Sequence, residues 1–397
     1  MNFAASARRL NSKWVLWGLL LLAAIGSTLP FWLTDLDIRA SALFYSPMPA
    51  ELGREASWPL GQSGVFNTLY LVGSALSWLV LVLTILAYAL PAVRKHPLLR
   101  QITLTTLATV ALGTGLLVNG LGKDFTGRPR PRTIEEFGGH SQYRKPLQLG
   151  TPGVGKSFPC GHCSAGYAVG AVGLALLSAR PALGLGIIVA SIGFGLAMGA
   201  ARMAAGAHFL SDVLWSGILT WLAALAAHSL LTRLRKEHVR RRWPPWLSYV
   251  GVGILSLAVV GGLLFTRPFH HQVRVRVPVA AMPAQWIFDT SVADLDIAVD
   301  PDARDAVSID GEIKGFGFPN VRVKESELVT GTQVLRQIRQ TGTAKEIDAP
   351  MKLTVRPEML DRIEVRIGTG NVKIVDPAYR ARLMPHVHIQ NATAEAQ

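Results

Sequence analysis

The residues best suited to chemistry in this sequence are two histidines and an aspartate with basic neighbours. In the segment that runs from Arg202 to Asp212, His208 and Asp212 lie four positions apart, so on a helix they would share a face and could hydrogen-bond. A carboxylate on one imidazole nitrogen fixes the tautomer and leaves the other nitrogen as a nucleophile. The structural alternative for Asp212 is a cap at the N-terminus of a helix.

A second group opens another apolar segment, with Ser157, Phe158, Pro159, Cys160, Gly161 and His162 in succession. The start of a helix offers unpaired N–H groups and a positive dipole end, which together bind anions. Gly161 allows close approach of a ligand to the backbone, and His162 could donate a proton. A lone histidine at a helix start is also common as a structural residue.

A third group is basic and rich in proline, from Lys123 to Arg130 and Pro131. Proline at 129 and 131 favours an extended segment, which can hold cations at fixed spacing without a helix. The alternative is a solvated basic loop that contacts anionic lipid head groups. Together the three groups supply cations, an acid and a nucleophile, which is the inventory for phosphoryl transfer.

The composition indicates a membrane protein. Of 397 residues, 50% are hydrophobic and 17% are charged, against about 25% charged residues in soluble proteins. Only two cysteines are present, and this composition excludes a disordered chain, a disulfide-rich scaffold and a coiled coil. The net charge of +14 lies wholly in the first 266 residues, since the remainder has 17 basic and 17 acidic residues. Basic loops between membrane spans explain this charge better than a nucleic-acid partner does.

The apolar runs predict an all-α polytopic membrane helix bundle of about seven spans, followed by a mainly-β extracytoplasmic C-terminal domain. The expected domains are an anchor helix and outer loop (1–60), the helix bundle (61–266) and the β-rich domain (267–397). Small residues on the faces of spans four to six predict close helix packing. The seven expected spans are Trp14–Leu33, Phe66–Leu90, Ile102–Leu121, Gly161–Leu177, Ala182–Ala201, Ser211–Leu231 and Trp246–Phe265.

The distribution of basic residues predicts that the N-terminus is inside and the C-terminal domain outside. The segments 34–65, 122–160 and 202–210 then face outward, and the three groups described above lie at the outer ends of neighbouring spans. Basic residues on this outer side run against the usual rule, and anion binding explains them. They are Lys123, Arg128, Arg130, Arg132, Arg144, Lys145, Lys156 and Arg202.

The three motifs resemble those of the type 2 phosphatidic acid phosphatase family of integral-membrane lipid phosphatases. They are Lys-x6-Arg-Pro from Lys123, Pro-Cys-Gly-His from Pro159, and Arg-x5-His-x3-Asp from Arg202. The resemblance implies His208 as nucleophile with Asp212 as its partner, and His162 as the acid for the leaving group. It also implies a phosphate held by Lys123, Arg130 and Arg202, with Cys160 and Gly161 at the helix start, and neither a metal ion nor a cofactor.

The expected function is therefore removal of phosphate from a lipid phosphate or diphosphate at the outer face of a bacterial cytoplasmic membrane, through a phosphohistidine. Two departures keep alternatives open, because Cys160 and Ala201 stand where the family often has serine. A thiol is a weaker hydrogen-bond donor than a hydroxyl. The alternatives are a lipid phosphotransferase and a catalytically weak or silent member that binds lipid phosphates.

Two other segments resemble motifs of unrelated functions. Gly150 to Ser157 is spelled like a phosphate-binding loop of nucleotide hydrolases, but the buried strand that such a loop requires does not precede it. Cys160 and Cys163 are spaced like a redox dithiol at a helix start, without the surrounding βαβ pattern of an oxidoreductase. A milder hypothesis is a disulfide that brackets His162 and makes activity sensitive to redox conditions.

The C-terminal domain alternates polar and apolar residues in several segments, for example Asp294–Val299 and Arg362–Ile367, as half-buried strands do. We expect a β-sandwich or a short β-solenoid, with a short helix within Gly331–Ala344. His386 and His388 alternate on an expected strand and are interpreted as surface residues. The domain contains no evident catalytic cluster, and it could bind an extracytoplasmic partner or the substrate.

Overall fold

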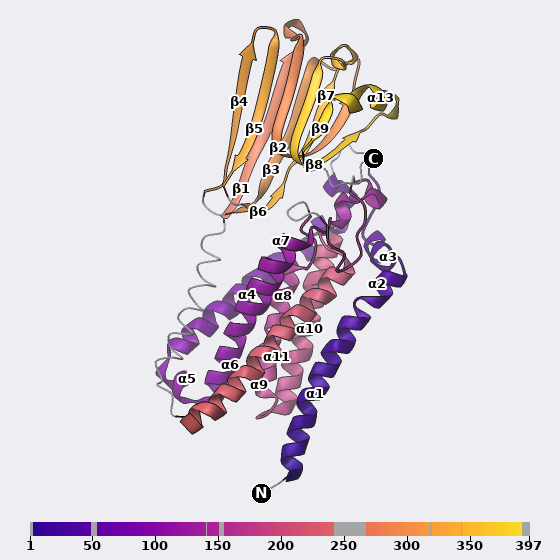
Figure 1. Ribbon diagram of the computed structural model, residues 1–397. Helices are drawn as coiled ribbons and strands as arrows, with labels where there is room; N and C mark the ends of the chain where they lie inside the picture. Colours follow the sequence, from indigo (N-terminus) through magenta and orange to yellow (C-terminus); the bar gives the residue numbers. More distant parts are fainter. Residues whose placement is uncertain are drawn as a thin grey trace. The chain divides into compact units, whose positions relative to one another are not determined.

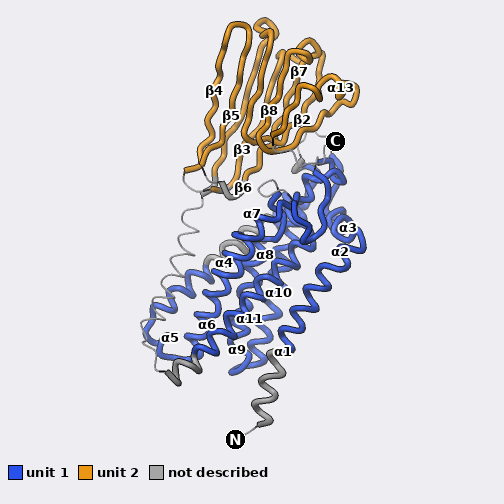
Figure 2. The backbone as a smooth tube through the Cα atoms, viewed as in Figure 1, with its two compact units in different colours: residues 1–261 blue, residues 262–397 orange. Residues whose placement is uncertain are grey.

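The protein is represented by a computed structural model, which divides into two compact units, residues 1–261 and 262–397 (Figures 1 and 2). The first unit is helical and the second is mainly β. The residues that the structure describes are 3–48, 54–139, 141–150, 155–241, 267–317, 320–342 and 344–390.

The helical unit contains long apolar helices joined by short helical turns (Figure 1). Its α-helices are α1 (Phe3–Gly26), α2 (Leu29–Leu33), α3 (Leu36–Ala42), α4 (Gly64–Ala89), α5 (Pro91–Lys95), α6 (Pro97–Ala108), α7 (Lys123–Thr126), α8 (Gly161–Ala168), α9 (Gly170–Leu176), α10 (Pro181–Ala204) and α11 (Leu210–Arg241). The π-helix η4 (Thr109–Gly122) continues α6, and the short 3-10 helices are η2 (Arg54–Ser57), η3 (Pro59–Gln62), η5 (Pro131–Thr133) and η6 (Glu135–Phe137).

Four segments of the described chain are long and apolar enough to cross a membrane, which makes this unit a membrane-integral bundle. They are Trp14–Leu33, Pro97–Gly122, Pro181–Ala204 and Leu210–Leu234. The predicted second span falls in α4, whose described apolar part is Leu79–Ala89. The predicted fourth span is divided into α8 and α9, each shorter than a membrane span. The predicted seventh span lies outside the described residues, so the count of about seven spans stays a prediction.

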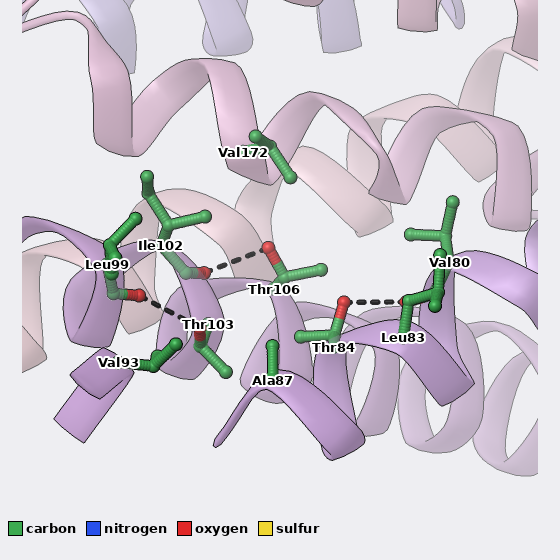
Figure 3. Close-up of a pocket in the computed structure, with 10 residues that line it drawn as sticks. All are labelled: Val80, Leu83, Thr84, Ala87, Val93, Leu99, Ile102, Thr103, Thr106 and Val172. Atoms are coloured by element: carbon green, nitrogen blue, oxygen red, sulfur yellow. Dashed lines mark hydrogen bonds between the residues drawn. The ribbon is translucent and has the colours of Figure 1, made fainter. Parts of the chain in front are cut away.

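Small residues allow the helices of the bundle to approach closely, as the sequence predicted. A β-carbon on Gly166 of α8 would lie 2.9 Å from the α-carbon of Gly195 in α10, so neither helix could tolerate a side chain there. A hollow of about 290 Å³ opens between α4, α6 and α9, lined by apolar residues and threonines such as Val80, Ile102 and Thr106 (Figure 3). Its described lining residues include no charged side chain, so the hollow differs in chemistry from an anion site.

The nine described strands of the second unit form one hydrogen-bonded sheet. Its central strand, β2, pairs in parallel with β8 along one edge and with β5 and β7 along the other. The strands are β1 (Arg267–Pro278), β2 (Gln285–Val299), β3 (Asp305–Gly317), β4 (Arg322–Thr330), β5 (Gln333–Thr341), β6 (Ala344–Asp348), β7 (Pro350–Val355), β8 (Ile363–Ile374) and β9 (Val387–Ile389).

The core of this unit follows the predicted alternation of polar and apolar residues. Leu295 and Ile297 are fully buried, and Trp286 stacks on Phe288 with ring centroids 6.0 Å apart. The helix expected within Gly331–Ala344 is wrong, because β5 occupies most of that segment and pairs with β2 and β4. Side-chain exposure of His388 is 57%, in agreement with its interpretation as a surface residue.

Candidate active site

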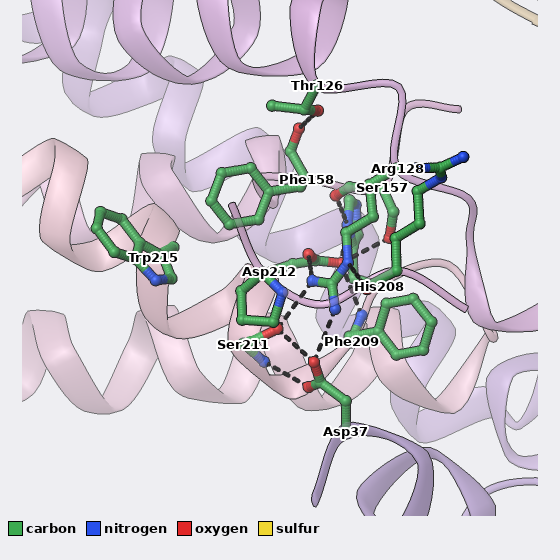
Figure 4. Close-up of polar contacts among 12 residues, drawn as sticks. Asp37, Thr126, Arg128, Ser157, Phe158, His208, Phe209, Ser211, Asp212 and Trp215 are labelled. Carbon is green, nitrogen blue, oxygen red and sulfur yellow. Dashed lines mark hydrogen bonds and ion pairs between the residues drawn. The ribbon is translucent and has the colours of Figure 1, made fainter. Parts of the chain in front are cut away.

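His208 lies in the turn between α10 and α11 and is almost fully buried. Its Nδ1 atom lies 2.6 Å from the carbonyl oxygen of Ser157 and 3.7 Å from Oδ2 of Asp212 (Figure 4). Because α11 begins at Leu210, the two residues do not share a helix face as their spacing suggested. A carbonyl only accepts hydrogen bonds, so Nδ1 carries the proton and Nε2 keeps its lone pair.

Asp212 is fully buried in the first turn of α11 and accepts several hydrogen bonds. The Ser157 hydroxyl donates to Oδ2 at 2.6 Å, and the backbone N–H of Phe209 donates to the same oxygen at 2.8 Å. The second contact is the helix cap that the sequence offered as an alternative to a catalytic role. The carboxylate therefore caps α11 and, through Ser157, holds the segment that binds His208.

Arg128 is 1% exposed and lies between two buried carboxylates (Figure 4). One terminal nitrogen donates to Oδ1 of Asp212, and the other donates to Oδ2 of Asp37 at 2.7 Å. The guanidinium also lies 4.5 Å from the centroid of the Phe209 ring. Loss of one partner from such a buried ion pair costs on the order of 3–5 kcal/mol, because the remaining charge is left uncompensated.

The sequence motifs did not assign Arg128, Ser157 or Asp37 to the site. Arg128 stood in the outer basic set, yet its partners are carboxylates rather than a ligand. Asp37 lies 91 positions before Arg128 and 174 before Ser211, so no local motif could associate it with either residue. One signal was available, since Asp37 is one of few acidic residues in the first 266 and directly follows the first expected span.

The start of α8 carries the second predicted group. Gly161 begins the helix, and a β-carbon on it would lie 2.4 Å from Oδ1 of Asn119 and 3.3 Å from Cε of Lys123. This close approach brings the Lys123 side chain to the helix start next to His162. The backbone N–H of Cys160 donates to the Asp212 carbonyl at 3.2 Å, which connects the same helix start to α11.

Cys160 and Cys163 are joined by a disulfide that brackets His162. In this oxidised form Cys160 has no S–H to donate, and its sulfur accepts from the N–H of Cys163 at 3.3 Å. The predicted contribution of Cys160 to phosphate binding through its thiol is therefore absent from the oxidised protein. In the oxidised protein, the donors that the start of α8 can still offer to a phosphate are its backbone N–H groups.

The remaining predicted cations lie on segments that the fold ties to His208. The N–H of Arg132 donates to the carbonyl of Gly206 at 3.0 Å, which places the Arg130 segment beside the turn before His208. Arg202 lies in the last turn of α10, and its carbonyl accepts from Ala207 at 3.0 Å. The structure thus gathers the three motif segments around one histidine.

The surroundings lower the pKa of His208 to about 4. Burial is the largest cause, and Asp212 opposes it, while the positive charges of Arg202 and Lys123 lower the pKa further. The imidazole is therefore neutral at physiological pH, which is the form that a nucleophile requires.

The loop spelled like a nucleotide-binding motif does not have the structure of one in its described part. Residues 151–154 lie outside the described chain. Ser157 starts no helix, since α8 begins at Gly161, and the Ser157 side chain is engaged by Asp212. A phosphate-binding loop of that class requires the helix to begin at the lysine and serine themselves.

Residues 103–236 match the family model of the PAP2 superfamily, which confirms the resemblance to type 2 phosphatidic acid phosphatases over the segment that holds all three motifs.

Two similar proteins are named lipid A 4'-phosphatases. The first, from Francisella tularensis subsp. novicida (strain U112), is 34% identical over 128 residues, which are 32% of this chain and 56% of that protein. The second, from Rhizobium leguminosarum, is 30% identical over 138 residues, or 34% of this chain and 56% of that protein. The chain therefore spans little more than half the length of these relatives.

Among solved structures, the chain is similar to a transmembrane PAP2 type phosphatidylglycerolphosphate phosphatase from Bacillus subtilis. The identity is 18%, and the match covers 56% of this chain and 96% of that one, with a TM-score of 0.28.

Proposed function

We propose that the protein is a membrane phosphatase that removes phosphate from a lipid phosphate or diphosphate. One observation carries the proposal: the buried His208, held through Nδ1 by the Ser157 carbonyl, lies in the turn on which the segments of Arg130 and Arg202 converge. The match to the PAP2 superfamily over residues 103–236 supports the same reaction class. The names of the two relatives make a lipid A 4'-phosphate the first substrate to test.

In the proposed reaction, Nε2 of His208 attacks phosphorus, and the bond from phosphorus to the lipid oxygen breaks. Burial and the nearby Arg202 and Lys123 lower the pKa of His162, and the negative charge of a bound phosphate counters these cations, so that His162 can carry the proton that it gives to the departing oxygen. Lys123, Arg130 and Arg202 balance the charge on the remaining phosphoryl oxygens. Water then attacks the phosphohistidine and gives a proton to the deprotonated His162, the phosphorus–nitrogen bond breaks, and inorganic phosphate leaves. A lipid acceptor in place of water would make the protein a phosphotransferase.

We further propose that this site faces the extracytoplasmic side of the cytoplasmic membrane, together with the C-terminal domain. The basic residues of the segments 94–100, 180 and 233–242 favour the cytoplasmic side for the opposite ends of the spans. The substrate would then be a lipid exposed in the outer leaflet. Labelling of single introduced cysteines at residues 133 and 236 with a membrane-impermeant reagent tests this orientation, since only the first should react in intact cells.

The activity is tested with purified wild type and a His208→Ala variant in detergent, with EDTA present. Phosphate release is measured from lipid A 4'-phosphate, an undecaprenyl diphosphate, phosphatidylglycerol phosphate and phosphatidic acid. We expect release by wild type on at least one of these and none by the variant. Equal release by both would refute the histidine mechanism. No release by a folded wild type on any substrate would favour a silent lipid-phosphate-binding protein, given Cys160 and Ala201.

A further inference from the structure

We propose that Asp37, which lies outside the three motifs, is a positioning residue of the phosphatase site and acts on it through Arg128. The inference rests on the proposed function. Asp37 belongs to α3, in the segment between the first membrane span and α4. Its side chain is fully buried, although it is a carboxylate on a short helix near the edge of the bundle.

The hydrogen bonds that the Asp37 carboxylate accepts lead toward the site. Oδ1 accepts from the backbone N–H of Ser211 at 2.9 Å, and Oδ2 accepts from the Ser211 hydroxyl at 2.6 Å. Oδ2 also accepts from Arg128 at 2.7 Å and from the Tyr143 hydroxyl at 3.0 Å. Ser211 is the neighbour of Asp212, so Asp37 fixes the first turn of α11 from outside that helix (Figure 4).

Arg128 completes the link because its two terminal nitrogens serve different carboxylates. One donates to Asp37 and the other to Asp212, while Nε donates to the carbonyl of Arg144 at 2.9 Å. A planar guanidinium with fixed donors transmits the position of one carboxylate to the other. With Asp37 neutral, the positive charge of Arg128 would be balanced by Asp212 alone, and the first turn of α11 would lose its outer anchor.

In this arrangement, the segment before α4 helps to position the nucleophile. Asp212 holds Ser157, and Ser157 holds Nδ1 of His208. A displacement of Asp212 would therefore change the direction of the nucleophile and leave the phosphate cations in place. The expected result of losing Asp37 is a lower kcat with KM nearly unchanged, whereas a defect in phosphate binding would raise KM.

The test compares Asp37→Asn with Asp35→Asn in the full-length protein in detergent. Asp35 lies two positions away and pairs with Arg39 at 2.6 Å, but both side chains are more than 60% exposed. Steady-state kinetics use the lipid phosphate on which wild type is active, and thermal unfolding is followed in parallel. We expect kcat to fall at least about tenfold in Asp37→Asn, as for loss of a charged hydrogen bond, and to stay within twofold of wild type in Asp35→Asn. Asp37→Glu should restore part of the loss.

A milder pair of variants keeps the test informative if Asp37→Asn does not fold. Tyr143→Phe removes one donor to Asp37, and Tyr45→Phe is its control in the neighbouring aromatic cluster. We expect a severalfold decrease in kcat for Tyr143→Phe and none for Tyr45→Phe. Asp37→Asn with wild-type kcat, or a rise in KM alone, would overturn the inference and leave the proposed function intact. An inactive wild type would overturn both.

Discussion

The Nδ1 atom of His208 lies 2.6 Å from the carbonyl oxygen of Ser157, and this contact fixes the tautomer of the imidazole. The expected partner for that nitrogen was Asp212, whose Oδ2 is 3.7 Å away. Asp212 instead accepts the Ser157 hydroxyl at 2.6 Å. A single serine therefore holds the histidine with its backbone and the aspartate with its side chain, so the carboxylate acts on the nucleophile indirectly.

Replacement of Ser157 by alanine tests this link. The backbone carbonyl remains for His208, but Asp212 loses a hydroxyl donor in a buried site, where a hydrogen bond to a charged group contributes about 1.5–3 kcal/mol. We expect kcat to fall by roughly tenfold to a hundredfold. Initial rates of phosphate release at saturating lipid phosphate measure the effect.

The matched control for Ser157→Ala is Ser164→Ala. The Ser164 hydroxyl is also buried, and it donates only to the Gly161 carbonyl within α8, at 2.7 Å. This variant should keep kcat within about threefold of wild type. The Gly161 carbonyl that loses a donor is neutral, and no buried carboxylate loses one. Equal losses in the two variants would mean that Ser157 contributes packing alone.

The pH dependence of kcat/KM should reveal the neutral histidine. Burial and the nearby cations lower the pKa of His208 to about 4, so the imidazole is neutral at every pH above that value. The acid limb is therefore expected near pH 4, and activity should be lost as the pH falls through it. In the unfolded chain the same group titrates near 6.5, so its contribution to stability also decreases as the pH falls from 6.5 toward 4.

The substrate complicates that profile, because a phosphate monoester has its second ionisation near pH 6. The ionisation constant of the lipid phosphate can be measured by 31P NMR in the same detergent. The contribution of substrate ionisation is then removed from the pH profile of kcat/KM. An acid limb that remains near pH 6.5 after this correction would contradict a histidine with a lowered pKa. A limb near pH 4 in the corrected profile would agree with it.

The motifs could be predicted from the sequence because each is local. Lys123 to Pro131, Ser157 to Cys163 and Arg202 to Asp212 are short segments whose residue types and spacing suffice to indicate an anion site. The C-terminal strands were equally visible where polar and apolar residues alternate, as in β2 and β8. Tertiary pairing overrode local preference in Gln333–Thr341, where a helix was expected and a strand forms between β2 and β4.

The contacts that hold the motifs together could not be predicted in this way. Asp37 reaches Arg128 and Ser211 only because three distant segments meet, and sequence separation conceals such contacts. Arg128 was expected to face a ligand because it stands among basic residues. Burial reverses that expectation, since a fully enclosed guanidinium requires carboxylates, and both Asp37 and Asp212 supply them.

The role of His162 as an acid can be separated from a role in binding by the choice of leaving group. A lipid alkoxide requires a proton to depart, whereas a nitrophenolate leaves readily without one. We expect His162→Ala to lose roughly a hundredfold or more in kcat with a lipid phosphate, as for loss of a general acid. With p-nitrophenyl phosphate the loss should be much smaller.

Lys123→Ala is the control for that comparison, because a cation that balances phosphoryl charge serves both leaving groups. Its activity should fall by a similar factor with the lipid phosphate and with p-nitrophenyl phosphate. If His162→Ala also lost the same factor with both substrates, the histidine would contribute to binding or folding and not to protonation of the leaving group.

The disulfide between Cys160 and Cys163 should make activity depend on reductant. It closes the first turn of α8 around His162, and its reduction frees that turn and restores a thiol at the position beside Gly161. We expect dithiothreitol to lower kcat of the wild type severalfold by loosening the helix start that positions His162. Cys163→Ser should begin at the reduced level and show no further response, while thiol counting before and after reductant verifies the redox state. An equal response of both proteins would exclude the disulfide as its cause, since the variant has no disulfide to lose.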